Sequence, residues 1–259
     1  MSHLLAYSIE GIGNPIVFIH GFCETKEIWT YFKKYFHPNF QTVCVDLPGF
    51  GDSPILEKEC SIPAMARCLK KTIDNLHLEK IVLVGHSLGG YVALSYAELF
   101  PEKVAGICLF HSTAFEDTPE KKENRNKTIE YVKKHGVEAF CNPFVPGLFF
   151  HKRRALLKND IEKVLQIAKK TQLSVVVDTT LAMRDRKDQT TLLQNMKIPV
   201  GFIVGKEDTA VPLERSLAQC HLADESHVLF LAETGHMGMF EREKECALFL
   251  RGICEGIFR

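Results

Sequence analysis

The sequence lacks the segments that mark export or membrane insertion. Its N-terminus, MSHLLAYSIEG, has no basic stretch followed by a long apolar one, and no window reaches the roughly 18 apolar residues that a membrane-spanning helix needs. Net charge is absent too, because 32 Lys and Arg balance 32 Asp and Glu. Nothing therefore favours nucleic acid or a membrane as partner, and we expect a cytoplasmic protein that acts on a small organic molecule.

Cysteine pairs and phosphate-binding loops are also missing. The nine cysteines form no CxxC pair, and no GxxxxGK[ST] motif occurs. An odd number of cysteines spread through apolar segments is typical of a reducing compartment, where they serve as small buried hydrophobic residues; metal binding or disulfide pairing is the alternative. We therefore expect no metal and no cofactor. Internal repeats are absent, and 259 residues suit one domain.

What the sequence contains is a series of apolar runs bounded by turn residues. Most runs are continuous rather than alternating, as in strands covered on both faces, and helical patterns separate them. This order predicts the α/β class, with a mostly parallel central sheet flanked by helices. The expected strands are 4–8, 15–21, 42–49, 80–86, 104–112, 199–208 and 226–236.

The interval 112–190 breaks this alternation. It opens with a charged run, continues through the aromatic-rich FCNPFVPGLFF, and offers helices rather than strands. Thr118 and Pro119 predict the start of its first helix. We expect a helical cap inserted into a core formed by 1–111 and 191–259.

Helical apolar spacing is visible in three segments outside that interval, at 61–76, 88–99 and 241–254. Ser61 is the expected N-cap of the first of them. Inside the interval, the segment 173–186 is ambiguous because its three valines favour a strand. Its length and spacing favour a helix, which is the prediction adopted here.

The stretch KIVLVGHSLGGYVAL, residues 80–94, joins a strand pattern to a helical pattern at a sharp turn. Its GHSLG matches GxSxG, in which a serine projects from a strained turn between glycines that leave it room. The pattern alone is weak, but it lies at the strand-to-helix junction that the motif requires. We therefore predict that Ser87 is a nucleophile; the alternative is a glycine-rich turn with an idle serine or an anion site.

A nucleophilic serine needs a base and a carboxylate that orients the base, and both are expected later in the chain. Asp208 follows the run GFIVG, and His236 follows the run HVLFLAE. Each lies after a predicted strand, where open α/β sheets gather their ligands. Glu207 competes with Asp208, which lies deeper in its loop. His227 lies at the wrong end of its strand, and His86 is expected to point away from the site.

Two backbone N–H groups are expected to bind the oxyanion of the reaction, and each such donor is typically worth about 2.7–4 kcal/mol. Leu88, directly after the nucleophile, gives one of them. Phe22, in the loop HGF after an apolar strand, gives the other. An ordinary strand-to-helix loop is the alternative for Phe22, and His20 is expected to brace this loop.

Together these residues resemble the α/β-hydrolase fold family, specifically its small capped esterase, lipase and haloperoxidase-like branch. The resemblance rests on HGF, DLPGFGDS, GHSLGG, IPVGFIVGKEDTAVP and GHMGMFE, in the family's order and at its usual intervals. It implies a triad of Ser87, Asp208 and His236, with Phe22 and Leu88 as oxyanion donors. It also implies that the cap largely decides the substrate.

The function so implied is hydrolysis of a carboxylic ester of a small organic substrate through an acyl-enzyme. Carbon–carbon bond hydrolases, perhydrolases and related lyases share the triad and stay open, as does a non-catalytic ligand-binding member. The serine argues against dehalogenases and epoxide hydrolases, which resemble this sequence elsewhere but place aspartate at that turn.

Pocket and assembly are the least determined features. Phe140, Phe144 and Met237 are the candidate pocket residues. Packing of the cap onto the sheet is the alternative for the two phenylalanines. The expected partner is a small ester-like molecule, and a homodimer is one option for the oligomeric state.

Overall fold

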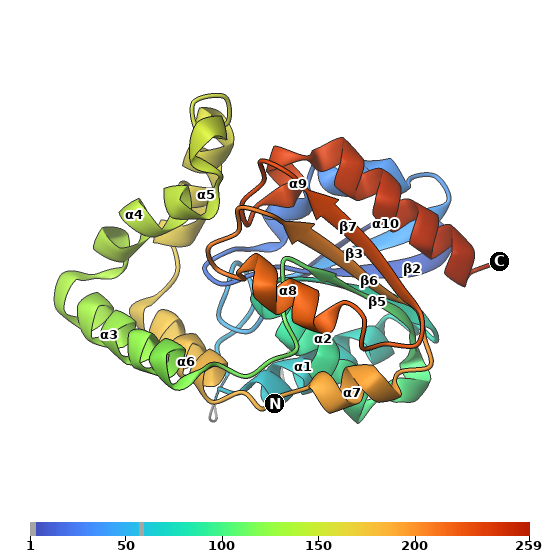
Figure 1. Cartoon of the computed structure of the whole chain (residues 1–259). Helices are drawn as coiled ribbons and strands as arrows, with labels where there is room; N and C mark the ends of the chain where they lie inside the picture. The colour runs from blue at the N-terminus through green and yellow to red at the C-terminus, as the bar shows by residue number, and fades with distance from the viewer. Residues whose placement is uncertain (1–3, 57–59) are drawn as a thin grey trace.

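The computed structural model describes residues 4–56 and 60–259, and a seven-stranded sheet forms its centre (Figure 1). The strand order is β1-β3-β2-β4-β5-β6-β7. Every pairing is parallel except that of β1 with β3. The predicted α/β class with a mostly parallel sheet is therefore confirmed. The strands are β1 (Tyr7–Glu10), β2 (Asn14–Ile19), β3 (Phe40–Val45), β4 (Ile81–His86), β5 (Val104–Phe110), β6 (Val200–Gly205) and β7 (Ser226–Leu231).

The continuous apolar runs form the middle of the sheet. Every residue of β4 and of β6 is buried, as expected for strands that are covered on both faces. The edge strand β1 differs from its prediction at 4–8. Its pairing with β3 begins at Tyr7, and Leu5, which precedes the strand, is buried. Three of the four β1 residues are exposed, so the apolar pattern does not fix where this strand begins.

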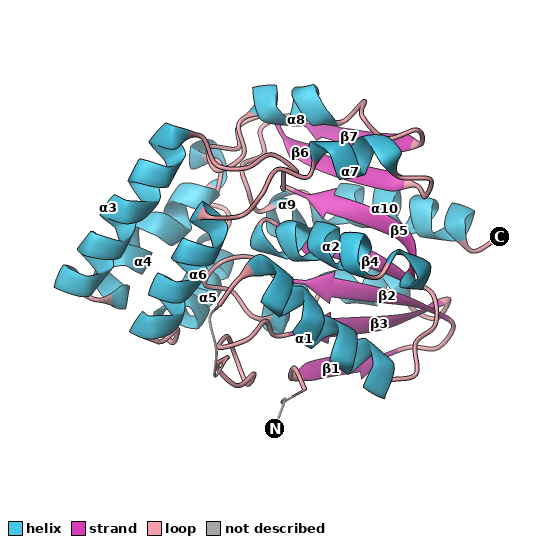
Figure 2. Cartoon of the chain, turned by 90° about the horizontal axis from the view of Figure 1, so that it is seen from below, coloured by secondary structure: helices cyan, strands magenta, loops and turns pink. Residues whose placement is uncertain are grey.

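Helices cover both faces of the sheet. Figure 2 shows α1 and α2 on one face and α10 on the other. Ser61 caps α1 as predicted, because its hydroxyl accepts the N–H of Ala64 at 3.3 Å. None of the helices in the described residues is long and apolar enough to cross a bilayer. The bounds are α1 (Ile62–Asn75), α2 (Leu88–Leu99), α7 (Thr190–Asn195), α8 (Leu213–Gln219), α9 (Gly238–Glu241) and α10 (Glu243–Ile257), with short 3-10 helices η1 (Lys26–Trp29), η2 (Phe32–Phe36) and η3 (Pro101–Lys103).

Residues 112–190, called the cap below, are all described and contain helices but no strand. The cap helices lie on the side toward which the parallel strands point (Figures 1 and 2). Thr118 caps the first of them, accepting the N–H of Lys121 at 3.3 Å. The ambiguous segment 173–186 is helical, as predicted. The helices are α3 (Pro119–His135), α4 (Val137–Leu148), η4 (His151–Arg153), α5 (Lys158–Lys169) and α6 (Leu173–Arg184).

Candidate active site

Ser87 occupies the sharp turn between β4 and α2. Its dihedrals, φ 50° and ψ −113°, lie where side chains other than glycine rarely go. Neighbouring glycines make this turn feasible, because a Cβ at Gly85 would overlap the backbone of Gly89 and one at Gly90 would overlap Ser112 Oγ. Ser112 Oγ also donates to the Ser87 carbonyl oxygen at 2.7 Å. The strained turn that the sequence predicts is present in the backbone.

Asp208 and His236 come from loops after β6 and β7 and meet at 2.7 Å between Oδ2 and Nδ1. Since a carboxylate oxygen only accepts, His236 Nδ1 carries the hydrogen and Nε2 keeps its lone pair. The other oxygen, Oδ1, accepts the N–H groups of Ala210 and Val211 at 2.8 and 2.9 Å. The carboxylate is thus fixed by its own loop. Glu207, the competing candidate, is exposed.

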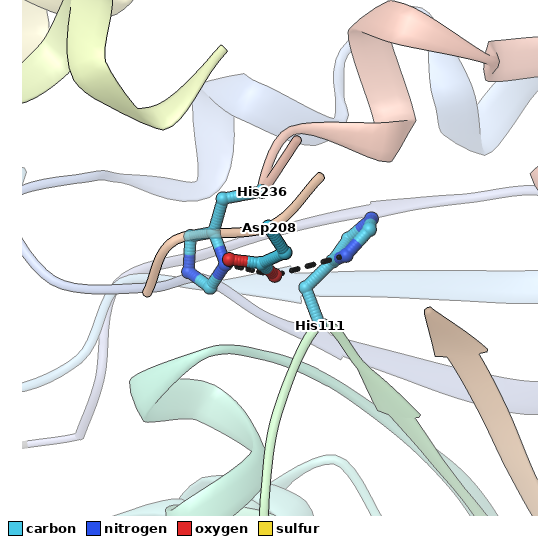
Figure 3. Close-up of side chains that lie close together, drawn as sticks. All are labelled: His111, Asp208 and His236. Carbon is cyan, nitrogen blue, oxygen red and sulfur yellow. Dashed lines mark hydrogen bonds and ion pairs between the residues drawn. The ribbon is translucent and has the colours of Figure 1, made fainter. Parts of the chain in front are cut away.

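A second histidine, His111, approaches the same carboxylate oxygen (Figure 3). Its Nδ1 lies 3.3 Å from Asp208 Oδ2 and 3.2 Å from the backbone nitrogen of Gly205, and its Nε2 lies 3.2 Å from the backbone nitrogen of Gly238. A hydrogen on Nδ1 satisfies both the Asp208 carboxylate and the Gly238 N–H at the expense of the Gly205 N–H, and in this tautomer His111 is a second donor to Asp208. Burial lowers the pKa of His111 to about 4, so its ring is neutral near pH 7. Sequence reasoning missed this residue, although it directly follows β5 and so carries the same strand-end signal that identified Asp208 and His236.

Asp208 remains ionised between these two rings. Burial by itself would raise its pKa. The adjacent His236 and the hydrogen bonds from His111 and His236 outweigh burial and hold the pKa of the Asp208 carboxyl well below its usual range. The negative charge that would stabilise a protonated His236 is therefore present at neutral and mildly acidic pH.

His86 does not point away from the site, as the sequence reasoning expected. Its Nδ1 lies 2.9 Å from Glu24 Oε2, and its Nε2 lies 2.9 Å from the carbonyl oxygen of His236. Both partners accept, so both ring nitrogens donate and the ring is an imidazolium. Glu24 Oε2 also accepts the N–H of Gly21 at 2.6 Å. Neighbouring side chains diverge in a tight turn, but the loops after β2 and β7 converge on the His86 side chain.

The pair of Glu24 and His86 is almost fully buried, with both residues 2% exposed or less. Burial opposes both charges. Their mutual attraction and hydrogen bond nevertheless lower the pKa of Glu24 and raise the pKa of His86 from their ordinary values. A buried ion pair thus ties the loop that carries Phe22 to the loop that carries His236.

Ser87 and His236 line one cavity of about 460 Å³. Among the hydrogen bonds of the described residues there is none between Ser87 Oγ and the His236 ring. Such contacts are often long in unliganded enzymes and tighten when substrate binds. The structure therefore brings the serine and the histidine to one cavity and joins the histidine to the carboxylate.

The amides of Phe22 and Leu88 are available for an oxyanion. Within residues 4–56 and 60–259, neither N–H donates to another residue. Leu88 is the first residue of α2, where backbone donors lack partners within the helix. His20 braces the other loop as predicted, because its Nδ1 donates to the Gly21 carbonyl at 2.7 Å and its Nε2 accepts the N–H of Leu47 at 2.9 Å.

A family model described as the alpha/beta hydrolase fold matches residues 14–243. The chain belongs to this family. Among solved structures, a thermophilic esterase from Thermogutta terrifontis, with malate bound, is 29% identical with a TM-score of 0.92, over 98% of this chain and 93% of that one. The family resemblance that the motifs indicate is confirmed.

Curated relatives of this α/β hydrolase include esterases and lipases. A pimeloyl-[acyl-carrier protein] methyl ester esterase from Pseudoalteromonas atlantica is 27% identical and covers 86% of this chain and 91% of its own length. The monoacylglycerol lipase ABHD6 of Homo sapiens is 25% identical over 90% of this chain and 72% of the lipase. A Bacillus subtilis relative of another kind, a putative 2-succinyl-6-hydroxy-2,4-cyclohexadiene-1-carboxylate synthase, is 30% identical over 131 residues, and the chain spans about half of that relative, 47% of its length.

Not every expected pocket residue of this α/β hydrolase faces the cavity. Phe22 and Phe144 line it, whereas Phe140 and Met237 are not among its lining residues. Phe140 stacks on Phe144, with ring centroids 4.8 Å apart. Met237 is fully buried in the hydrophobic core at the start of α9. The aromatic side chains thus both line the cavity and pack the cap, so the two alternatives for them coexist.

Glu241 of this α/β hydrolase fixes the loop that carries His236. Its Oε1 accepts the N–H groups of the residues on either side of His236, at 2.9 and 3.2 Å. Its Oε2 accepts the N–H of Phe150, and His236 N–H donates to the carbonyl of Leu148 at 2.7 Å. The imidazole is therefore anchored to the end of α4 in the cap as well as to the core.

The three residues His111, Asp208 and His236 also place ligand-type atoms within 4.8 Å of one another. In the hydrogen-bonded arrangement, both Nδ1 atoms carry hydrogens directed at the carboxylate. A nitrogen that carries hydrogen has no lone pair for a metal ion. The chemistry of this cluster therefore fits an orienting carboxylate better than a metal centre.

Proposed function

We propose that this α/β hydrolase is a serine hydrolase that cleaves a carboxylic ester of a small organic molecule through an acyl-enzyme. The observation that carries the proposal is the bond between Asp208 and His236. It leaves His236 Nε2 with a lone pair in the same cavity as the strained Ser87. A histidine so oriented serves as general base toward a serine hydroxyl.

In the proposed reaction, Ser87 Oγ attacks the ester carbonyl while His236 Nε2 takes the hydroxyl proton. The amides of Phe22 and Leu88 donate to the oxyanion that forms. His236 then passes the proton to the leaving alcohol, and the acyl-enzyme remains. Water is deprotonated by His236 and cleaves this ester, which returns the proton to Ser87. Asp208 holds the ring and stabilises its protonated form throughout.

The pH dependence follows from the same residues. Since the pKa of Asp208 lies well below its usual range, protonation of Asp208 does not limit the rate at mildly acidic pH. A general base must be unprotonated, so kcat/KM is expected to fall once the pH is low enough to protonate that base. A rate that never falls as the pH is lowered would count against His236 in this role.

The decisive experiment is hydrolysis of p-nitrophenyl esters of increasing chain length by the wild type and by Ser87→Ala. Loss of Ser87 is expected to lower kcat by several powers of ten, because triad members act as a unit. Near wild-type hydrolysis by Ser87→Ala would refute the nucleophile. A peroxide-dependent halogenation assay and a vinylogous diketone, run beside the esters, test for a perhydrolase and a carbon–carbon hydrolase. A fluorophosphonate probe that fails to label Ser87 in folded protein would favour a ligand-binding role instead.

A further inference from the structure

The cavity that holds Ser87 and His236 is lined by side chains of two kinds. Its apolar lining, called the apolar wall below, includes Phe22, Phe144 and Met183. Its polar lining, called the polar wall below, includes residues of α3 and of α8. The lining residues on this polar wall include Lys121, Asn124, Arg125 and Thr128 of α3 and Arg215 of α8.

The polar face of α3 is turned toward the cavity at helical spacing. Positions 121, 124, 125 and 128 are three or four residues apart, so they share one side of the helix. Ile129 and Val132, the buried residues of α3, continue the same side of the helix toward its C-terminus, so this side faces the protein along the length of α3. A cap helix thus presents charged side chains to the cavity that contains the candidate nucleophile.

Two cations on this wall have no carboxylate partner among the described residues. Lys121 Nζ donates to the carbonyl oxygen of Ala210 at 3.0 Å, which leaves its charge uncompensated. The Arg215 guanidinium lies over the ring of Phe115, 4.9 Å from the centroid. Neither side chain forms an ion pair within the described residues, although each is partly buried.

The third cation, Arg125, is only partly neutralised. Its Nε lies 3.0 Å from Asp117 Oδ2, but the same carboxylate also binds Arg186 at 2.7 Å, so one negative charge faces two guanidinium groups. The carboxylates that line the cavity are Glu24, already paired with His86, and the exposed Glu120. The ionised Asp208 is bonded to His236 and adds one more negative charge. The four cations Lys121, Arg125, Arg186 and Arg215 still outnumber the three carboxylates Asp117, Glu120 and Asp208, so a surplus of positive charge remains, although the whole chain has equal numbers of basic and acidic residues.

We propose that this cavity takes an ester that carries an anionic group, a carboxylate or a phosphate, bound by Lys121 and Arg215 while the apolar wall holds the carbon chain. The proposal rests on the proposed function, because it names the substrate class of that site. Hydrogen bonds from a cation to an anion are roughly twice as strong as those between neutral groups. The guanidinium fork and the ammonium group both bind carboxylate and phosphate oxygens.

Three p-nitrophenyl esters, which share the same leaving group, test this proposal. They are mono-p-nitrophenyl adipate, its neutral methyl ester, and p-nitrophenyl 6-phosphonooxyhexanoate. The wild type is expected to favour at least one anionic ester over the methyl ester by about ten- to hundredfold in kcat/KM, the range expected for a hydrogen bond to a charged group. This preference should weaken as salt is added.

The variant Lys121→Gln/Arg215→Gln is expected to lose most of this preference while it still cleaves the methyl ester. The matched control is Lys122→Gln, because Lys122 is the next residue of α3, pairs with Glu116 at 3.0 Å and does not line the cavity. This control should keep the preference. A larger effect for the carboxylate or for the phosphate ester supports the proposal and identifies the group.

Equal kcat/KM for the charged and neutral esters in the wild type, or a preference retained by the double variant, would overturn the proposal. Binding by calorimetry separates this result from a failure of the proposed function. Monomethyl adipate and dimethyl adipate need no turnover, so tighter binding of the monoacid, lost in the double variant, supports the anion site even if no ester is cleaved. Equal binding of the two compounds overturns it.

Discussion

Removal of His86 alone is expected to cost more stability than removal of both His86 and the charge of Glu24. In His86→Phe, the Glu24 carboxylate stays buried and keeps only the Gly21 N–H as partner. At an effective dielectric constant of 20, two unit charges about 4 Å apart attract by about 4 kcal/mol. Breaking one side of a buried ion pair likewise costs about 3–5 kcal/mol, so His86→Phe should lower the free energy of unfolding by that amount.

Glu24→Gln should act in opposite directions in the two backgrounds. In the wild type, Glu24→Gln replaces a charged hydrogen bond and is expected to lower the free energy of unfolding by about 1.5–3 kcal/mol. In His86→Phe it removes an unpaired buried charge, while the amide oxygen still accepts the Gly21 N–H. In that background, Glu24→Gln should raise the free energy of unfolding by about 2 kcal/mol. Urea denaturation of the four proteins measures this cycle, and destabilisation by Glu24→Gln in both backgrounds would refute the ion pair.

The pH dependence of the same cycle has a definite sign. The pKa of His86 is raised above its ordinary 6.5, so its contribution is fully present below pH 6.5 and is lost as pH rises through the folded value. The pKa of Glu24 is lowered below its ordinary 4.5, so its contribution is fully present above pH 4.5 and is lost as pH falls through the folded value. The stability advantage of the wild type over the double variant should therefore be largest between pH 4.5 and 6.5. An advantage that keeps growing above that range would contradict the assignment of an imidazolium.

Two further predictions concern the turn and the carboxylate. Gly90→Ala should lower the free energy of unfolding by about 1–3 kcal/mol through overlap with Ser112, and Ser112→Gly should recover part of this loss, as thermal denaturation would show. If Ser112→Gly recovers none of the lost stability, overlap with Ser112 is not the cause of the destabilisation in Gly90→Ala. His111→Phe removes one donor to Asp208 and should lower kcat for a p-nitrophenyl ester by about tenfold or more, whereas His221→Phe, at an exposed position, should leave kcat unchanged. Equal rates for His111→Phe and wild type would exclude His111 as a residue that positions Asp208.

The features that the sequence predicts well are those encoded within one segment. β4 and the turn at Ser87 follow from an apolar run, two flanking glycines and a helical pattern, all within 15 residues of chain. Asp208 and His236 are assigned because the ends of parallel strands share one edge of the sheet, so position after a strand is enough to place them together. The edge strand β1 shows the limit of this approach, since its mostly exposed residues carry no clear apolar pattern.

The contacts that the sequence does not predict join residues far apart in the chain. Glu24 and His86 are 62 positions apart, and His86 and His236 are 150 apart. The identity of His86 says only that a polar ring lies beside the nucleophile. Whether that ring turns away or becomes a buried cation depends on which loops converge on it. His111 is a different case, because it directly follows β5. That position alone indicates a residue at the same edge of the sheet as Asp208 and His236.

The substrate preference is also hard to predict from sequence, because a charged residue of the cap can either lie outside the cavity or line it. In the sequence, Lys121 and Lys122 are neighbours in the charged run EDTPEKKENRNK and cannot be told apart. In the structure, Lys122 pairs with Glu116 outside the cavity, whereas Lys121 lines the cavity that contains Ser87. Lys121 and Lys122 are only 100° apart around α3, yet Lys122 lies outside the cavity and Lys121 is a candidate determinant of substrate specificity. The candidate triad can therefore be located from local patterns, whereas the proposed preference for an anionic ester can be inferred only when the cap is placed over the sheet.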